Sequence, residues 1–138
     1  MPEFTPNQKL AISARNSNIL ITAAAGSGKT TVLAARIAAL IEEGADINRM
    51  LVCTFTQAAA AEMKTRIADT LARRSEETGN LRLAAQAELA VNADICTIHS
   101  FAQRVIKENF AHIGVSADLR VAGEVDRFLK RAGMLRRL

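Results

Sequence analysis

The sequence predicts an α/β fold built on a parallel sheet. Three short apolar runs, at residues 18–22, 50–54 and 94–97, are each followed by a helical pattern. Short apolar runs between turn-forming residues are typical of buried strands, whereas apolar residues at three- and four-residue spacing indicate amphipathic helices. Strands that alternate with helices favour parallel pairing through right-handed crossovers. At 138 residues the chain is one domain, or a piece of one, and is long enough to bury a core.

The first helix has a strong start signal. Thr5 suits the N-cap, Pro6 suits the first helical position, and Gln8 can close a capping box. This helix is expected to run to about Ala14. The other predicted helices cover residues 30–43, 57–73, 81–91, 100–110 and a basic stretch from 124 onward, with a polar break at 75–80.

Composition and cysteine content indicate a cytoplasmic globular protein. The chain is 49% hydrophobic and 23% charged, and no apolar run approaches the roughly 18–20 residues that a membrane span needs. Its first four residues lack the basic and apolar regions of a signal peptide, and we expect no membrane partner. Cys53 and Cys96 each lie in an apolar run, so we expect two buried, reduced thiols rather than a disulfide or a metal site.

The net charge of +4 is unevenly distributed along the chain. Residues 1–118 hold 12 basic and 12 acidic side chains, whereas residues 119–138 hold six basic and two acidic ones. The basic character therefore belongs to the C-terminal stretch and does not indicate a basic groove in the body of the fold.

A small-residue loop follows the first apolar run and leads into a helix. Glycines in such a loop let backbone N–H groups turn inward around phosphate oxygens at the positive end of the helix. Lys29 is placed to meet the outer phosphates, and the Thr30 hydroxyl to hold Mg²⁺. The general pattern asks for glycine where this chain has Ala23. The alternative is a turn of small residues that binds no ligand and whose lysine is merely solvated. It does not explain why the two glycines and the Lys-Thr pair occur together. The loop comprises Ala23, Ala24, Ala25, Gly26, Ser27, Gly28, Lys29 and Thr30.

Two further stretches, Thr54–Met63 and Thr97–Phe101, follow the other predicted strands. In a parallel sheet the loops after the strands share one rim, where ligands bind. Thr54 and Thr56 suit contacts to phosphates and Phe55 suits a base face. From composition alone, the alternative that Phe55 is core and the threonines begin a helix is favoured.

His99 can also be interpreted without a ligand-binding role. A single histidine at a strand end is more often a local hydrogen-bonding residue than a ligand. Neither of the two histidines has a partner at metal-ligand spacing, and the sequence has no Ser/His/Asp nucleophile elbow.

Taken together and in this order, these stretches resemble the early motifs of superfamily 1 DNA helicases of the UvrD/Rep type. Thr5–Gln8 resembles the adenine-reading Gln motif, and Ala23–Thr30 the first motif, where small residues ahead of Gly-x-Gly-Lys-Thr are normal. Thr54–Ile67 resembles the Thr-Phe-Thr motif with its helix, and Thr97–Phe101 the next DNA-contacting motif. The alanine runs and Thr-Ile-His-Ser-Phe are most similar to AddA/RecB-like helicase–nuclease subunits. The resemblance extends to about residue 110.

The resemblance implies a RecA-like P-loop NTPase fold. Residues 1–112 would be the N-terminal part of the ATP-binding motor domain 1A, and residues 113–138 a basic helical extension towards an insertion domain. The parent protein would be an ATP-dependent 3′→5′ DNA helicase of recombination and repair, acting with a second helicase–nuclease subunit.

The resemblance also implies roles for individual residues. Gln8 would read adenine and the loop from Ala23 to Thr31 would hold ATP, with Lys29 and Thr30 in the catalytic machinery and Mg²⁺ at Thr30. Gln57 departs from the asparagine that is common in the family. Single-stranded DNA would be contacted by Thr54, Phe55, Thr56, Thr97, His99 and Ser100.

One part of the family pattern has no match in this sequence. No apolar strand ends in Asp-Glu, and the second motor domain with its arginine fingers is not in the chain. Such arginines contribute about 10³–10⁵ in rate to phosphoryl transfer. We therefore expect the 138-residue chain to bind Mg-ATP weakly and to hydrolyse it negligibly. A stand-alone nucleotide-binding module is the rival interpretation. An unrelated P-loop kinase would leave Thr54–Ile67 and Thr97–Phe101 unexplained.

Overall fold

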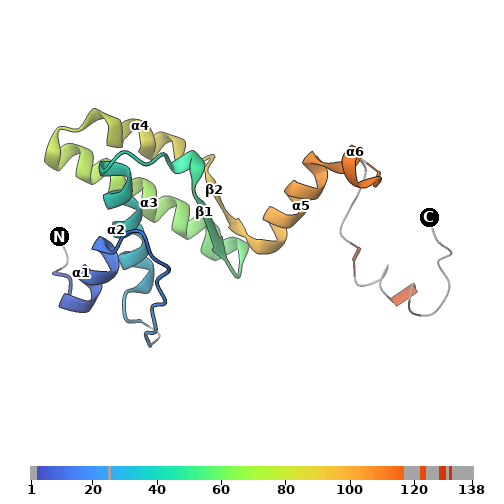
Figure 1. The fold of residues 1–138 in the computed structure, drawn as a ribbon, viewed down its shortest axis with the longest axis horizontal. Helices are drawn as coiled ribbons and strands as arrows, with labels where there is room; N and C mark the ends of the chain where they lie inside the picture. Colours follow the sequence, from blue (N-terminus) through green and yellow to red (C-terminus); the bar gives the residue numbers. More distant parts are fainter. Residues whose placement is uncertain (1–2, 25, 117–121, 124–127, 130, 132–138) are drawn as a thin grey trace. The chain divides into compact units, whose positions relative to one another are not determined.

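The computed structural model of the chain describes residues 3–24, 26–116, 122–123, 128–129 and 131. The chain forms two compact units, residues 1–101 and 102–138, and each is considered by itself. The elements, in chain order, are α1 (Pro6–Ser13), α2 (Lys29–Glu42), the 3₁₀ helix η1 (Ile47–Arg49), β1 (Leu51–Thr54), α3 (Gln57–Thr78), α4 (Leu81–Leu89), β2 (Asp94–Thr97), α5 (Ile98–Glu108) and α6 (Phe110–Ile113) (Figure 1).

The sheet of the first unit is a parallel pair, β1 beside β2, as Figure 1 shows. Val52 lies opposite Ile95 and Thr54 opposite Thr97. The chain crosses from β1 to β2 through α3 and α4, and α3 packs against both strands. The predicted α/β fold with parallel pairing is thereby confirmed.

The core forms where α2, α3, α4 and the sheet meet. On α3 the buried residues Ala60, Met63, Ile67 and Leu71 follow one another at three- and four-residue spacing, so one stripe of the helix faces inward. Burial of each large aliphatic side chain contributes about 1.5–3 kcal/mol. The largest fully buried side chains are Ile41, Ile47, Ile67, Leu71, Leu83 and Ile95.

The strand expected at residues 18–22 does not form, although all five residues are described. Leu20 is 92% exposed, and Ile19 and Ile21 are also exposed. A strand requires hydrogen-bonding neighbours, and among the described residues β1 and β2 pair only with each other. The prediction of a strand here is therefore wrong, because the apolar run has no partner strand within the described part of the chain.

Helix α3 extends beyond its predicted end near Arg73. Ser75 is buried and its Oγ donates to the carbonyl oxygen of Asn80 at 2.9 Å, which folds the polar stretch into the helix end. The helix stops at Gly79, whose φ of 70° is readily adopted by glycine. The predicted polar break at 75–80 is thus reduced to the short connection between α3 and α4.

The two cysteines also differ from expectation. Cys53 is exposed and Cys96 is half-buried, because both lie on the face of the sheet opposite to the buried Val52 and Ile95. The helix predicted from residue 124 lies largely outside the described residues.

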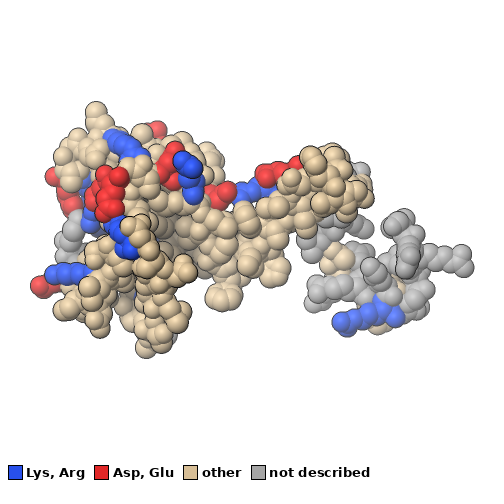
Figure 2. Space-filling model, in the orientation of Figure 1, with Lys and Arg blue, Asp and Glu red and all other residues tan. Residues whose placement is uncertain are grey.

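Charge is mixed on the surface of the first unit. Figure 2 shows acidic and basic side chains intermingled on the face that it presents, in agreement with the neutral charge balance of residues 1–118. Among the described residues, no helix combines the length and apolarity that crossing a bilayer requires.

Candidate functional site

The glycines of the loop before α2 adopt the backbone conformation that a phosphate-binding loop needs. Gly26 and Gly28 have φ values of 76° and 81°, in the left-handed region that glycine adopts without strain. Gly28 caps α2, which begins at Lys29. The first turn of a helix leaves N–H groups without intrahelical acceptors and carries the positive end of the dipole. The loop therefore ends in a group of donors suited to an anion.

The Lys29 side chain folds back over this loop. Its Nζ donates to the carbonyl oxygens of Ala23 at 2.8 Å and Ala24 at 2.6 Å. An ammonium group has three donors, so these two hydrogen bonds occupy most of its capacity. A phosphate that binds Lys29 must compete with these carbonyls for the ammonium group.

Gln8 brings α1 into contact with the loop. The side-chain Oε1 of Gln8 accepts from the backbone N–H of Thr5 at 2.9 Å, and the backbone N–H of Gln8 donates to Thr5 Oγ1 at 3.4 Å. The predicted capping box is therefore confirmed. The side-chain Nε2 of Gln8 donates to the Ser27 carbonyl oxygen at 3.2 Å. The amide keeps one further lone pair and one further hydrogen, which are the groups needed to pair with the N6 and N7 edge of adenine.

A pocket of about 310 Å³ lies between α1 and the loop. This volume is at the lower end of the range for small-molecule sites. Its lining combines apolar side chains with a few polar groups and includes Gln8, Ala11, Ile21, Ala23, Ser27 and Lys29.

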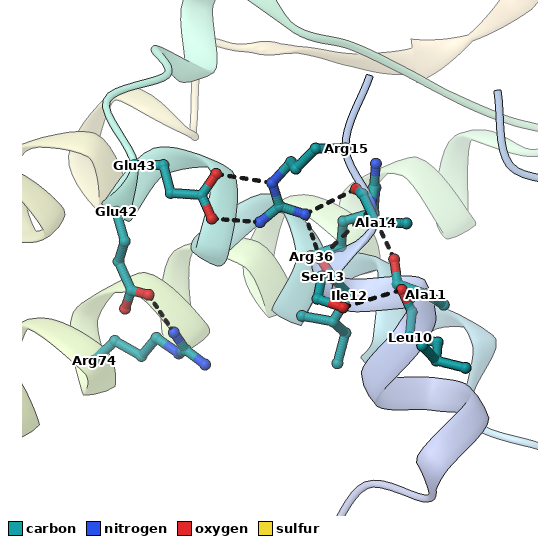
Figure 3. Close-up of polar contacts among 10 residues, drawn as sticks. All are labelled: Leu10, Ala11, Ile12, Ser13, Ala14, Arg15, Arg36, Glu42, Glu43 and Arg74. Carbon is teal, nitrogen blue, oxygen red and sulfur yellow. Dashed lines mark hydrogen bonds and ion pairs between the residues drawn. The ribbon is translucent and has the colours of Figure 1, made fainter. Parts of the chain in front are cut away.

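Two arginines hold the C-terminal end of α1 in place, as Figure 3 shows. Arg36, on α2, donates to the carbonyl oxygens of Ala11 and Ala14 at 2.7 Å each and of Ile12 at 3.4 Å. Arg15 donates to Ile12 at 2.6 Å and Ala14 at 2.9 Å. The last carbonyls of a helix have no intrahelical donors and carry partial negative charge, so guanidinium groups stabilise this end.

Arg15 also anchors the connection to the end of α2. Its Nε and Nη2 each donate to a carboxylate oxygen of Glu43 at 2.7 Å, forming a bidentate pair (Figure 3). The hydrogen bond from Arg15 lowers the pKa of Glu43, and the same bond raises the pKa of Arg15. Neither arginine was identified from the sequence, because the acceptors of Arg36 are backbone carbonyls that leave no residue pattern and Glu43, the side-chain acceptor of Arg15, lies 28 residues away.

The end of β1 presents an aromatic ring to solvent. Phe55 is fully exposed, so the alternative that it belongs to the core is wrong. Thr56 caps α3 by accepting a hydrogen bond from the Ala59 N–H at 3.1 Å. The other part of that alternative, in which the threonines begin a helix, is therefore confirmed for Thr56. Thr54 Oγ1 donates to the Thr56 carbonyl oxygen at 3.0 Å and shapes the turn around the ring.

The end of β2 is joined to the end of β1 through Ser100. Thr97 is only 6% exposed, its Oγ1 lies 2.9 Å from Ser100 Oγ and it accepts from the Ser100 N–H at 3.2 Å. Gln57 Nε2 donates to Ser100 Oγ at 2.8 Å. His99 is exposed beside these contacts. Gln57, noted in the sequence only as a departure, therefore links the two strand ends.

The structure brings together two of the three stretches that were expected to share a rim. Thr54 and Thr97 are partners in the strand register, so the turn at residues 55–56 is adjacent to the first turn of α5. The loop expected after β2 is replaced by this helix, because α5 begins at Ile98 directly after Thr97. The position of the phosphate loop on the same rim was inferred from a strand at 18–22, which does not form.

A separate contact joins α3 to the first turn of α2: Arg66 Nη1 donates to Thr31 Oγ1 at 3.3 Å.

The comparisons with known proteins identify the family. The family described as UvrD/REP helicase N-terminal domain matches residues 4–136, and the chain belongs to it. The chain is 45% identical over 140 residues to an ATP-dependent helicase/nuclease subunit of Clostridium acetobutylicum, covering 98% of this chain and 11% of that protein. It is 43% identical over 138 residues to the protein of the same name from Heliobacterium modesticaldum, covering 97% of this chain and 10% of that protein. The resemblance to UvrD/Rep-type helicases and to their helicase–nuclease subunits is confirmed, and the chain spans about a tenth of the length of these relatives.

Proposed function

We propose that this chain is the nucleotide- and single-strand-binding segment of an ATP-dependent 3′→5′ DNA helicase of the helicase–nuclease type. Residues 1–112 would form the N-terminal part of a RecA-like motor domain and residues 113–138 an extension towards an insertion domain. The observation that carries the proposal is the pairing of Thr54 with Thr97, which places a fully exposed Phe55 beside the first turn of α5, where His99 lies. The relatives are each named as one subunit of a helicase/nuclease, which supports a second subunit of this kind as the partner of the whole protein.

The residues around the phosphate loop fit ATP and Mg²⁺. The left-handed glycines leave the backbone open, and a Cβ added at Gly26 would meet nothing within 4 Å, so phosphates can approach closely. Lys29 would bind the outer phosphates after releasing its loop carbonyls, and Thr30, on the first turn of α2, would hold Mg²⁺. Ala23 to Thr31 would cradle the phosphates through their N–H groups. ATP, when bound, supplies the free energy for translocation.

The residues that follow β1 and β2 fit a single strand of DNA. Phe55 offers a ring face on which a base can stack. The Thr56 hydroxyl oxygen accepts the cap hydrogen bond, so its own proton is available to a phosphate oxygen. His99 is exposed on the first turn of α5.

Thr54, Thr97 and Ser100 are less exposed than Phe55 and His99. Thr54 donates its proton to the Thr56 carbonyl and would contact a phosphate only after releasing it. Thr97 is buried, and we assign it to positioning Ser100 rather than to touching DNA.

The DNA-binding role is tested in a chain that lacks residues 124–138, so that the basic stretch does not mask the loops. At low salt, Phe55→Ala should weaken binding of a labelled oligothymidine about tenfold, because base–aromatic stacking contributes about 1–3 kcal/mol. Phe110→Ala, which removes an aromatic ring from α6, is the matched control and should change affinity less than twofold. Fluorescence anisotropy measures both.

The salt dependence separates the loops from the basic stretch. Each neutralised phosphate contributes about −0.7 to the slope of log K against log salt on a single strand. The 138-residue chain should show a slope of roughly −3 to −4, and removal of 124–138 should make it shallower, while Phe55→Ala leaves the slope unchanged. Equal binding by the Phe55→Ala and parent chains after the deletion would contradict the loop assignment.

The role of Gln8 is tested by two substitutions. Gln8→Ala removes the side-chain amide and with it the Thr5 N–H···Oε1 hydrogen bond of the capping box, but leaves the Thr5 cap in place. By analogy with lost helix caps it should cost at most about 0.5–2 kcal/mol of stability, and it should abolish the preference for ATP over GTP. Gln8→Glu keeps the capping box, because glutamate also serves at that position, but loses the Nε2 donor. Its melting temperature should stay near that of the parent while the preference for ATP disappears. If Gln8→Glu still prefers ATP as strongly as the parent, Gln8 is only a cap.

A further inference from the structure

Two thiols that lie 43 residues apart in the chain are neighbours in the sheet. Cys53 of β1 is the register partner of Cys96 of β2. Directly opposite residues of a parallel pair project to the same face, and here that face is the open one, since Val52 and Ile95 on the other face are buried. Both cysteines are free thiols, Cys53 exposed and Cys96 half-buried.

The sheet geometry places the Cα atoms of the two cysteines within the range that a disulfide spans. Neighbouring strands lie about 4.7–4.9 Å apart. Disulfides form between residues whose Cα atoms are about 4.4–6.8 Å apart, so register partners satisfy this requirement without sliding the strands. The register is in turn fixed by the buried partners on the other face, because a slip of one residue would turn them outward.

We propose that Cys53 and Cys96 form a dithiol modification site, at which a low-molecular-weight disulfide oxidises the pair to a disulfide joining β1 to β2. The Cys53 thiolate, the more exposed, attacks one sulfur of the reagent, forms a mixed disulfide and displaces one thiolate. The Cys96 thiolate then attacks the Cys53 sulfur and displaces the second. Two protein thiols are oxidised, the reagent is reduced to two thiols, and the two protein protons pass to the departing thiolates.

The site lies one residue before the last residue of each strand. Cys53 precedes Thr54, and Cys96 precedes Thr97. A bond at this position ties together the two strands close to the ends that carry Phe55 and His99. The chemistry of the site depends only on the register and the accessibility of the sulfurs, and so stands apart from the proposed function.

The test uses the reduced 138-residue chain equilibrated with reduced and oxidised glutathione, then quenched with acid and alkylated with N-ethylmaleimide. Intact mass should identify an internal disulfide, with two hydrogens lost and neither glutathione nor maleimide attached. The bond should form about tenfold more readily in the native chain than in the same chain in denaturant, because the sheet holds the sulfurs together.

Single substitutions complete the test. Cys53→Ser and Cys96→Ser each leave one thiol and should instead accumulate the mixed disulfide with glutathione; circular dichroism checks that each variant folds. Because the readout is mass, it does not depend on nucleotide or DNA binding. A native chain that carries glutathione on its cysteines instead of the internal bond, that stays reduced, or that oxidises no more readily than in denaturant would overturn the proposal.

Discussion

Lys29→Ala is expected to lower the affinity of the chain for Mg-ATP about 100-fold. Charge-assisted hydrogen bonds contribute about 1.5–3 kcal/mol each, and about 1.4 kcal/mol is a factor of ten in affinity. Lys29 stands at the first position of α2, where its ammonium already finds the carbonyls of Ala23 and Ala24 and is placed to exchange them for phosphate oxygens. Titration calorimetry at low salt measures the change.

The matched control for Lys29→Ala is Lys107→Ala. Lys107 is an exposed lysine of α5, and its substitution removes the same charge from a different part of the chain. It should leave the affinity within twofold. Both variants should keep the circular dichroism spectrum of the parent, since the carbonyl contacts of Lys29 are exposed. Retention of ATP affinity by Lys29→Ala would remove the phosphate loop from the proposal.

Arg36→Met should destabilise the first unit by about 1.5–3 kcal/mol. Methionine keeps most of the aliphatic stem but removes the guanidinium donor of the Ala11 carbonyl and leaves the Ala14 carbonyl to Arg15 alone, and hydrogen bonds to charged groups are worth this amount. Because α1 carries Gln8, loosening α1 should also reduce discrimination between ATP and GTP. Urea unfolding followed by circular dichroism measures the first effect and titration calorimetry the second.

Two comparisons sharpen the Arg36 experiment. Arg73→Met removes an exposed arginine whose ion pair with Glu77 spans 3.9 Å, and should cost at most about 0.5 kcal/mol. Arg15 shares the Ile12 and Ala14 carbonyls with Arg36, so the double substitution of both arginines by methionine should deviate from additivity. Equal stability losses for Arg36→Met and Arg73→Met would show that the carbonyl contacts do not hold α1.

The features predicted correctly from the sequence are those decided over a few residues. The capping box of Thr5 and Gln8 spans four residues, and the start of α2 follows from Gly28 next to Lys29. Strands β1 and β2 are short apolar runs that also pair with each other in the sheet. In these cases local propensity and tertiary environment agree.

The errors concern residues whose state depends on distant partners. Residues 18–22 have the composition of a strand, but a strand also requires a neighbour, which the run itself does not reveal. The burial of Cys53 was inferred from its apolar neighbours, whereas alternation along β1 turns it to the open face. Arg36 and Gln57 were missed because their partners lie 22 to 43 residues away and include backbone atoms.

The hydrogen bond from Gln57 to Ser100 has a consequence for how a ligand meets the strand ends. It couples the first turns of α3 and α5, so the conformational entropy of arranging them is lost when the chain folds and not when a ligand arrives. A single strand bound as proposed would therefore meet a preorganised surface, and we expect the contributions of Phe55 and His99 to its affinity to be interdependent. Breaking this one contact would leave every contacting side chain in place and still weaken binding, because the ordering cost would move to the binding step.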